Sequence, residues 1–267
     1  MNILLLDIDG VLVQPGGYRK AVRATLDHFI NQVGLRNLAP EEEDIAYCES
    51  LGITNEWDII PICLGVIIET LLDKNPKISL PVKWKEVSNI LRNLDSVIDQ
   101  VDYQTKIQKV GKLIKIGISP SNAILENGLA DIVNHPFPLL SSQPFFRSLF
   151  LDTKEVTKSI TTSRFQNYVL GSQIYQEIYK TKAQVNTQSY LTLFDHTLVS
   201  DKILSNILIL TQLGKLIPVI VSTRPSLPPR DAFPIQNGFS PEAEMGIYLR
   251  ELIERIQKDA RSDFFYH

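Results

Sequence analysis

The sequence predicts an α/β fold in which a large helical insertion separates two strands of one parallel sheet. Two continuous apolar runs, residues 3–6 and 216–221, end at polar residues, and the long stretch between them is mostly amphipathic with helical spacing. A short apolar run that ends in polar residues is typical of a strand buried on both faces, as in a parallel sheet. We therefore expect a core formed by both ends of the chain, with the insertion directly after the first strand.

Composition and charge exclude several classes of protein. The chain has 267 residues, 44% of them hydrophobic, and a net charge of −3, so it can bury a core but carries no strong positive field for nucleic acid. No apolar stretch approaches the roughly 20 residues that a membrane-spanning helix needs. Only Met1 and Asn2 precede the first apolar run, so the cationic start of a signal peptide is lacking. The two cysteines, Cys48 and Cys63, match no metal-binding spacing. These features predict a cytoplasmic protein without a nucleic-acid or membrane partner.

Helical periodicity dominates the insertion, and turn residues divide it into segments. Helices are predicted over residues 18–33, 42–51, 56–73, 84–98, 103–116, 120–133, 164–182 and 201–214. Residues 189–194 alternate in polarity and predict a short strand that returns the chain to the core. The predicted domains are an α/β core of residues 1–14 and 193–267 and a helical domain of residues 15–192.

Two carboxylates, Asp7 and Asp9, follow the first strand, with Gly10 directly after them. Ligands bind at the carboxyl ends of strands in open α/β sheets, and alternate residues of an extended chain point the same way. One carboxylate can then attack as a nucleophile while the other transfers protons, and Gly10 permits a tight turn that brings main-chain N–H groups near an anion. Two negative charges beside a phosphate need a counter-cation, so the pattern also predicts Mg²⁺. An acidic turn after a buried strand is the alternative interpretation.

The segment DIDGVLV, which begins at Asp7, resembles the first motif of the haloacid dehalogenase superfamily, DxDG[TV]. In that family the first Asp is phosphorylated, and the second is the general acid and then the general base. The resemblance implies a Rossmann-like core, with Asp7 as the nucleophile and Asp9 as the acid/base residue. It also implies that Asp7 and the main-chain carbonyl of Asp9 bind Mg²⁺. A second Asp in this motif is typical of the phosphatase and mutase branches.

The segment VIVSTRP resembles the second motif of the same family, in which an apolar strand ends in a Ser or Thr that holds the transferring phosphoryl group. Ser222 follows the apolar run directly and matches that position. A VTGRP version, found in part of the family, places Thr223 at the glycine and Arg224 at the arginine, so Thr223 is a second candidate. Arg224 is either a phosphate-binding residue or a surface arginine ahead of a proline-rich loop.

The helical insertion occupies the position of the C1-type cap of the family, which closes over the site and selects small substrates. The segment GITNEWD, residues 52–58, is similar to a cap segment of some subfamily-I members. This likeness makes Asn55 and Asp58 candidates for contact with a substrate. For Asn55 the alternative is a helix N-cap, because its side chain can accept a hydrogen bond at the start of the predicted helix over residues 56–73.

A second segment, LFDHTLVSD at residues 193–201, echoes the first motif superficially. It lacks the second Asp and the Gly of that motif. We therefore interpret Asp195 and His196 as the hinge between the cap and the core.

The later motifs of the family are not found in this chain. Beyond Arg224 the family requires a Lys and then acidic residues that complete the Mg²⁺ site, whereas residues 240–267 predict one amphipathic helix. We therefore expect a core that is incomplete relative to the family. A truncated form, a proteolysed product and a short natural form without activity all fit this expectation.

The expected function is that of a Mg²⁺-dependent phosphatase, a hydrolase that acts on a small phosphorylated metabolite through an aspartyl-phosphate. One alternative is a catalytically inactive relative that binds a ligand or a partner, which the missing motifs favour. The other is a phosphomutase that uses the same pair of aspartates. The sequence indicates neither the substrate nor the oligomeric state.

Overall fold

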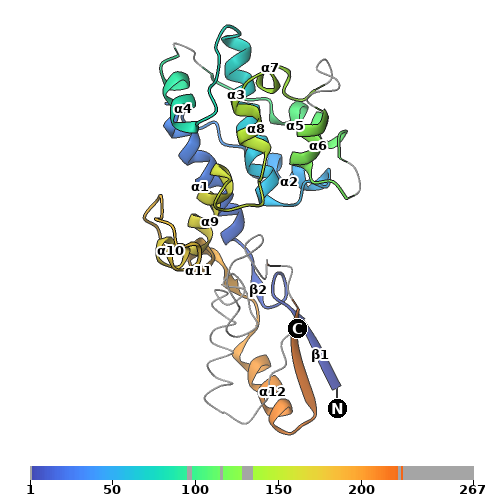
Figure 1. Ribbon diagram of the computed structural model, residues 1–267. Helices are drawn as coiled ribbons and strands as arrows, with labels where there is room; N and C mark the ends of the chain where they lie inside the picture. Colours follow the sequence, from blue (N-terminus) through green and yellow to red (C-terminus); the bar gives the residue numbers. More distant parts are fainter. Residues whose placement is uncertain (1, 95–97, 115–116, 128–134, 222–223, 225–267) are drawn as a thin grey trace. The chain divides into compact units, whose positions relative to one another are not determined.

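The computed structural model (Figure 1) describes residues 2–94, 98–114, 117–127, 135–221 and 224. These residues form a mixed α/β structure that has little sheet and is rich in helix, which makes up 55% of the described residues. Contacts divide the chain into two compact units. Unit 1 is formed by the described residues within 1–21 and 166–267, and unit 2 by those within 22–165. Unit 1 is thus discontinuous in sequence; the predicted domain boundaries, after residue 14 and before residue 193, stay predictions.

A parallel pair of strands forms the centre of unit 1. Strand β1 (Asn2–Asp7) lies beside β4 (Leu216–Val221), as Figure 1 shows. The register pairs Asp7 with Val221, so both strands reach their carboxyl ends at the same edge. The two strands predicted from the apolar runs are confirmed, and so is their parallel direction.

A helix and a short pair of strands also belong to unit 1. Helix α12 (Asp201–Gln212) leads into β4 and confirms the predicted helix. A short antiparallel pair joins β2 (Val13–Gln14) to β3 (His196–Thr197). Side chains from β1, the turn after it and α12 form one hydrophobic cluster, whose buried members are Leu6, Ile8, Leu12, Val13, Leu204 and Ile207.

The burial of β1 differs from the prediction. Ile3 and Leu5 are each 67% exposed, whereas Leu6 is buried in the cluster with α12. Successive side chains of a strand point to opposite faces, so a helix packed on one face leaves the alternate residues on the other. The prediction that this strand is buried on both faces is therefore wrong.

Unit 2 is helical and is organised around α3, which contacts α5, α6, α7 and α8. The helices that lie in unit 2 or cross its limits are α1 (Gly17–Gln32), α2 (Glu42–Ser50), α3 (Glu56–Lys74), α4 (Trp84–Arg92), α5 (Tyr103–Gly111), α6 (Pro120–Asn127), α7 (Pro138–Ser141), α8 (Phe145–Phe150) and α9 (Ile160–Leu170). Nearly every residue of α3 from Asp58 to Leu72 is buried, which agrees with its apolar sequence on all sides. Of the helices within the described residues, none has both the length and the apolar character to cross a membrane.

The structure corrects two predicted elements near the end of the insertion. The helix predicted over residues 164–182 is two helices, α9 and α10 (Ser172–Tyr179), separated by Gly171 at φ 77° and ψ 161°. The strand predicted over residues 189–194 is helix α11 (Tyr190–Phe194), which Ser189 caps by accepting a hydrogen bond from the N–H of Thr192. A side chain that satisfies the first turn favours helix over strand in so short a segment. The helix predicted over residues 240–267 lies outside the described residues.

A chain of hydrogen bonds between α1 and α4 includes His28, a side chain of unit 2 that can titrate. Trp84 donates from its indole N–H to the Oε1 of Gln32, and the Gln32 amide donates to the Nε2 of His28 at 2.9 Å. Burial, and then the charge of Arg164, lower the pKa of His28 from 6.5 to about 4. His28 therefore stays neutral, as a hydrogen-bond acceptor, over most of the acidic range.

We expect the free energy of unfolding to fall as the pH drops from 6.5 towards 4. Over this window the unfolded chain protonates His28 and the folded protein does not, so protons favour the unfolded state. Urea unfolding at pH 7 and at pH 5, followed by tryptophan fluorescence, measures the loss. The variant His28→Gln should lose less stability over the same interval. An equal loss in both proteins would contradict this role for His28.

Candidate active site

The carboxylate of Asp7 lies at the end of β1, beside the end of β4. Its Oδ1 accepts a hydrogen bond from the N–H of Ile8 at 2.8 Å, and the residue is exposed. The residues that follow Val221 on the neighbouring strand include the predicted phosphate-binding candidates Ser222 and Thr223, which lie outside the described residues. The register alone thus brings the first motif beside the start of the second.

The turn after Asp7 is closed by main-chain hydrogen bonds. Gly10 has φ 80°, a conformation that favours glycine, and its N–H donates to the carbonyl of Val13 at 2.7 Å. The N–H groups of Leu12 and Val13 both donate to the carbonyl of Ile8. The N–H of Gly10 therefore has a protein acceptor, and its predicted contact with a phosphate stays a prediction.

Arg224 binds the carboxylate of Asp9 with two of its nitrogens. Nη2 lies 2.6 Å from Oδ1 of Asp9, and Nε lies 3.1 Å from Oδ1 and 3.0 Å from Oδ2. The side chain of Arg224 is 1% exposed and that of Asp9 is 26% exposed. The side chain of Arg224 is therefore buried in this site, which contradicts the surface-arginine interpretation, while its contact with a phosphate stays a prediction.

A second carboxylate, that of Asp195, holds the same guanidinium. Its Oδ2 lies 2.7 Å from Nη2 of Arg224. Its Oδ1 accepts hydrogen bonds from the N–H groups of Gly16 at 2.9 Å and Gly17 at 2.8 Å. Both oxygens of this fully buried side chain are thus satisfied by donors of unit 1.

The two glycines allow this close approach. A Cβ on Gly16 would lie 2.5 Å from the carbonyl oxygen of Phe194, and one on Gly17 would lie 2.7 Å from the Cα of Leu191. Real Cβ atoms do not come this near to backbone atoms. The glycine pair at the start of α1 is therefore a local sequence signal for contact with the segment that ends at Asp195.

The surroundings of Arg224 favour its charged form. Burial opposes the charge, but the hydrogen bonds to Asp9 and the neighbouring Tyr18, Asp9 and Asp195 outweigh it and raise the pKa of Arg224. The ring of Tyr18 lies 5.5 Å from the guanidinium carbon, within the range of a cation–π contact. We therefore treat Arg224 as a permanent cation between two carboxylates.

Asp195 was missed as a site residue by the sequence analysis, which interpreted it as part of a hinge. The segment around it resembles the first motif too weakly to suggest a role, and its partners lie 29 and about 178 residues away along the chain. An acidic residue where the chain returns from the insertion, together with the glycine pair at the start of the insertion, was the available signal.

The donors at the strand ends are of the chemical kind that Mg²⁺ prefers. Mg²⁺ takes oxygen ligands and often binds through one or two carboxylates together with water and substrate phosphate. Asp7 offers an exposed carboxylate, and Asp9 offers its main-chain carbonyl, while the Asp9 side chain is bound to Arg224. In the part of the chain that the structure describes, no three His, Cys, Asp or Glu side chains gather into a metal-binding group. The donor set thus fits the ion in kind, through two direct protein ligands.

Asn55 and Asp58, the candidates for substrate contact, have partners within unit 2. Asn55 caps α3 by accepting a hydrogen bond from the N–H of Trp57 at 2.9 Å. Asp58 is buried and accepts from the N–H of Ser121 at 3.2 Å and from its hydroxyl. Burial raises the pKa of Asp58, against the hydrogen bonds from Ser121 and the charge of Lys154. These contacts account for both side chains as parts of the helical structure, and their contact with a substrate stays a prediction.

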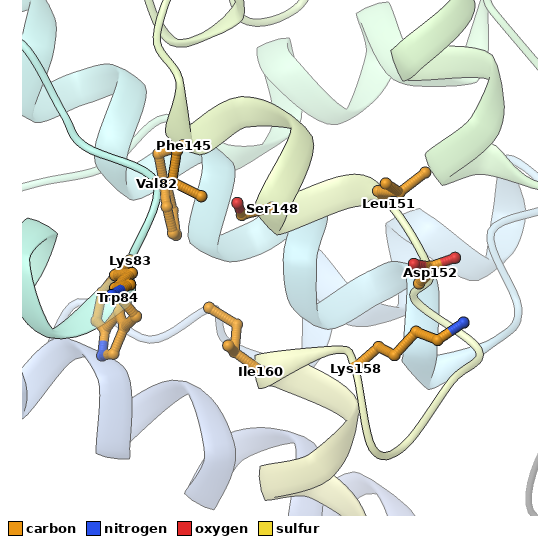
Figure 2. Close-up of a pocket in the computed structure, with 9 residues that line it drawn as sticks. All are labelled: Val82, Lys83, Trp84, Phe145, Ser148, Leu151, Asp152, Lys158 and Ile160. Atoms are coloured by element: carbon orange, nitrogen blue, oxygen red, sulfur yellow. The ribbon is translucent and has the colours of Figure 1, made fainter.

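A separate cavity of about 340 Å³ lies in unit 2. Figure 2 shows Trp84 and Lys83 on one side of it and Asp152 and Lys158 on the other, with Phe145 and Ile160 among the apolar lining. Neither Asn55 nor Asp58 is among the described residues that line it. The predicted substrate residues and this cavity are therefore distinct features of unit 2.

Comparison with known proteins supports a shared fold. No family model matches the chain, and no curated protein gives a significant match. An X-ray structure described as a Northeast Structural Genomics Consortium target is 17% identical, has a TM-score of 0.58 and covers 84% of this chain. The chain spans 63% of the length of that structure. A likeness at this identity indicates fold and says nothing of function.

Proposed function

We propose that the chain is a haloacid dehalogenase-like hydrolase that removes phosphate from a small phosphorylated metabolite. One observation carries the proposal: the parallel pairing of β1 with β4 places Asp7 and Asp9 beside the segment that contains Arg224. Such an edge, where parallel strands end, is where ligands bind in α/β sheets. The proposed core, with the helical insertion as its C1-type cap, rests on the motif resemblance and on this geometry.

In the proposed reaction the carboxylate of Asp7 attacks the phosphorus, and the bond to the leaving oxygen breaks. Asp9 gives its proton to that oxygen, then takes a proton from the water that hydrolyses the aspartyl-phosphate. Asp7 and the carbonyl of Asp9 would hold Mg²⁺, which, when bound, offsets the charge of the phosphate.

The variant Asp7→Asn tests the nucleophile. We expect kcat for a generic aryl phosphate, assayed with Mg²⁺, to fall roughly 10⁴-fold or more, because an amide cannot form the acyl-phosphate. The exposed position of Asp7 predicts an unchanged midpoint of urea unfolding. Asp73→Asn, an equal change at an exposed position of α3, is the matched control and should keep full activity. Comparable activity in Asp7→Asn would sink the aspartyl-phosphate mechanism.

A second candidate function, binding of a phosphorylated ligand without turnover, is favoured by two observations. Both side-chain oxygens of Asp9 contact Arg224, and the described residues supply no third acidic metal ligand. Phosphate release from a panel of phosphometabolites separates the two candidates. Binding by calorimetry without release would support the second, and isomer conversion without release would indicate a phosphomutase.

A further inference from the structure

We propose that Asp195 is a positioning residue of the site: it fixes Arg224, and Arg224 in turn fixes the carboxylate of Asp9. The inference rests on the proposed function, in which Asp9 transfers protons. It assigns a role to a residue that lies outside both motifs of the sequence analysis and that carries a fully buried charge.

The main chain sets the orientation of the Asp195 carboxylate. Two consecutive N–H groups, of Gly16 and Gly17, donate to the same oxygen, Oδ1. The other oxygen, Oδ2, is thereby aimed at Nη2 of Arg224, 2.7 Å away. A carboxylate held in this way by main-chain donors has little freedom to turn, and a charge-assisted bond adds to its fixity.

The bond to Asp195 restricts the position of the Arg224 guanidinium. Arginine has a long side chain with considerable rotamer freedom, and its planar fork orients a carboxylate well only when the fork itself is held. In this site, Nη2 is shared between Asp9 and Asp195, and the ring of Tyr18 lies beside the guanidinium. Removing the charge of Asp195 takes away one of the two carboxylates that hold the guanidinium.

Burial distinguishes a positioning role of Asp195 from a catalytic one. The side chain of Asp195 is 0% exposed and is not accessible to a substrate, whereas that of Asp9 is 26% exposed. Its effect on the reaction must therefore pass through Arg224. A misplaced Asp9 harms the step that needs its proton, which is departure of the leaving oxygen.

The test compares Asp195→Asn with wild type on two substrates, p-nitrophenyl phosphate and an alkyl phosphate. The asparagine keeps an oxygen for Gly16 and Gly17 but removes the negative charge at Arg224. Nitrophenolate leaves without a proton, whereas an alkoxide requires one. We expect kcat to fall about 10²-fold on the alkyl phosphate and less than about 5-fold on the aryl phosphate. Asp102→Asn is the matched control, because Asp102 accepts from the N–H of Thr105 in unit 2 and its amide can do the same.

A second readout does not depend on activity. The Nε–H signal of Arg224 in ¹⁵N NMR spectra should exchange slowly with water in wild type and in Asp102→Asn, and faster in Asp195→Asn. An equal loss of kcat on both substrates, or an unchanged Arg224 signal, would overturn the positioning role. If wild type hydrolyses neither substrate, the proposed function fails, and a change in the Arg224 signal then supports only the anchoring of Arg224, which overturns the catalytic part of the inference.

Discussion

Replacing Arg224 with Met is expected to lower the free energy of unfolding of unit 1 by about 3–5 kcal/mol, the usual effect of leaving a buried charge without its partner. Methionine fills much of the same space but supplies no donor. Among the described residues, the carboxylate of Asp195, at 0% exposure, would then keep the two N–H groups of Gly16 and Gly17 as donors. The loss comes from that uncompensated charge more than from the contacts of the arginine itself.

The position of the tryptophans allows a clean measurement of this effect. The only two in the sequence, Trp57 and Trp84, lie in unit 2, so their fluorescence reports on unit 2 and not on the site. Hydrogen exchange of β1, read by mass spectrometry, reports on unit 1. We expect its most protected amides to exchange about 10²- to 10³-fold faster in Arg224→Met, since each tenfold step is about 1.4 kcal/mol. The unfolding midpoint seen by fluorescence should move little.

Two comparisons sharpen the Arg224 prediction. Arg23 pairs with Glu41 at 3.3 Å on the surface, with side-chain exposures of 41% and 67%. Arg23→Met should therefore cost less than about 1 kcal/mol. In the double variant Arg224→Met with Asp195→Asn, part of the lost stability should return, because the stranded charge is gone. Equal small losses for both arginines would show that burial of the Asp9–Arg224–Asp195 group does not matter.

Replacing Gly171 with Ala is expected to destabilise unit 1 by about 3–5 kcal/mol. At φ 77° and ψ 161° the residue lies in a region that only glycine occupies readily, at a cost of about 1–3 kcal/mol for other residues. A Cβ would also lie 2.6 Å from the backbone nitrogen of Ser189, which must move. Overpacking of this kind adds a similar amount.

The clash at Gly171 is directed at the segment that carries the site. Ser189 begins helix α11, and that helix ends directly before Asp195. The N–H of Ser172, next to Gly171, donates to the carbonyl of Thr187 at 2.9 Å, so the two segments are tied at this point. We therefore expect Gly171→Ala to lower both stability and proper placement of Asp195.

Gly214 provides the control for Gly171. It also lies in unit 1 and has φ 67°, but a Cβ there meets nothing within 4 Å. Gly214→Ala should cost only the ordinary left-handed penalty of about 1–2 kcal/mol. Hydrogen exchange of β1 compares the two variants in the same unit. Similar losses would mean that the approach to Ser189 relaxes without cost.

Elements whose residues follow a single hydrophobic period were predictable from the sequence. The strands and α12 follow from apolar runs and helical spacing, and their bounds agree with the structure. The prediction was wrong where a local pattern is compatible with two kinds of secondary structure. Residues 189–194 alternate in polarity as a strand does, yet Ser189 caps a short helix, α11, at this place. An isolated glycine is tolerated in many helices, so the sequence alone did not indicate that the chain leaves the helix at Gly171, where it approaches Ser189.

The candidate site shows a similar limit. Asp7, Asp9 and Gly10 were found because they are adjacent in one motif, and Arg224 because it follows the second strand. The role of Asp195 depends on contacts with residues far along the chain in both directions. No local spacing in the sequence indicates these contacts of Asp195. The burial of only one face of β1, where burial of both faces was predicted, likewise depends on where α12 packs.

The pairing of β1 with β4 also determines how late during synthesis β1 can acquire its partner strand. Asp9 and Arg224 are 215 residues apart, and all of unit 2 lies between them. Ribosomes add about 5–20 residues per second, so β1 waits roughly 10–40 s for its partner strand. All residues of unit 2 are synthesised before those of β4, and the contacts between its helices join residues that are nearer in sequence. Strand β1 is made before unit 2 and is therefore among the last elements to reach its native contacts, because its partner strand follows unit 2 in the sequence.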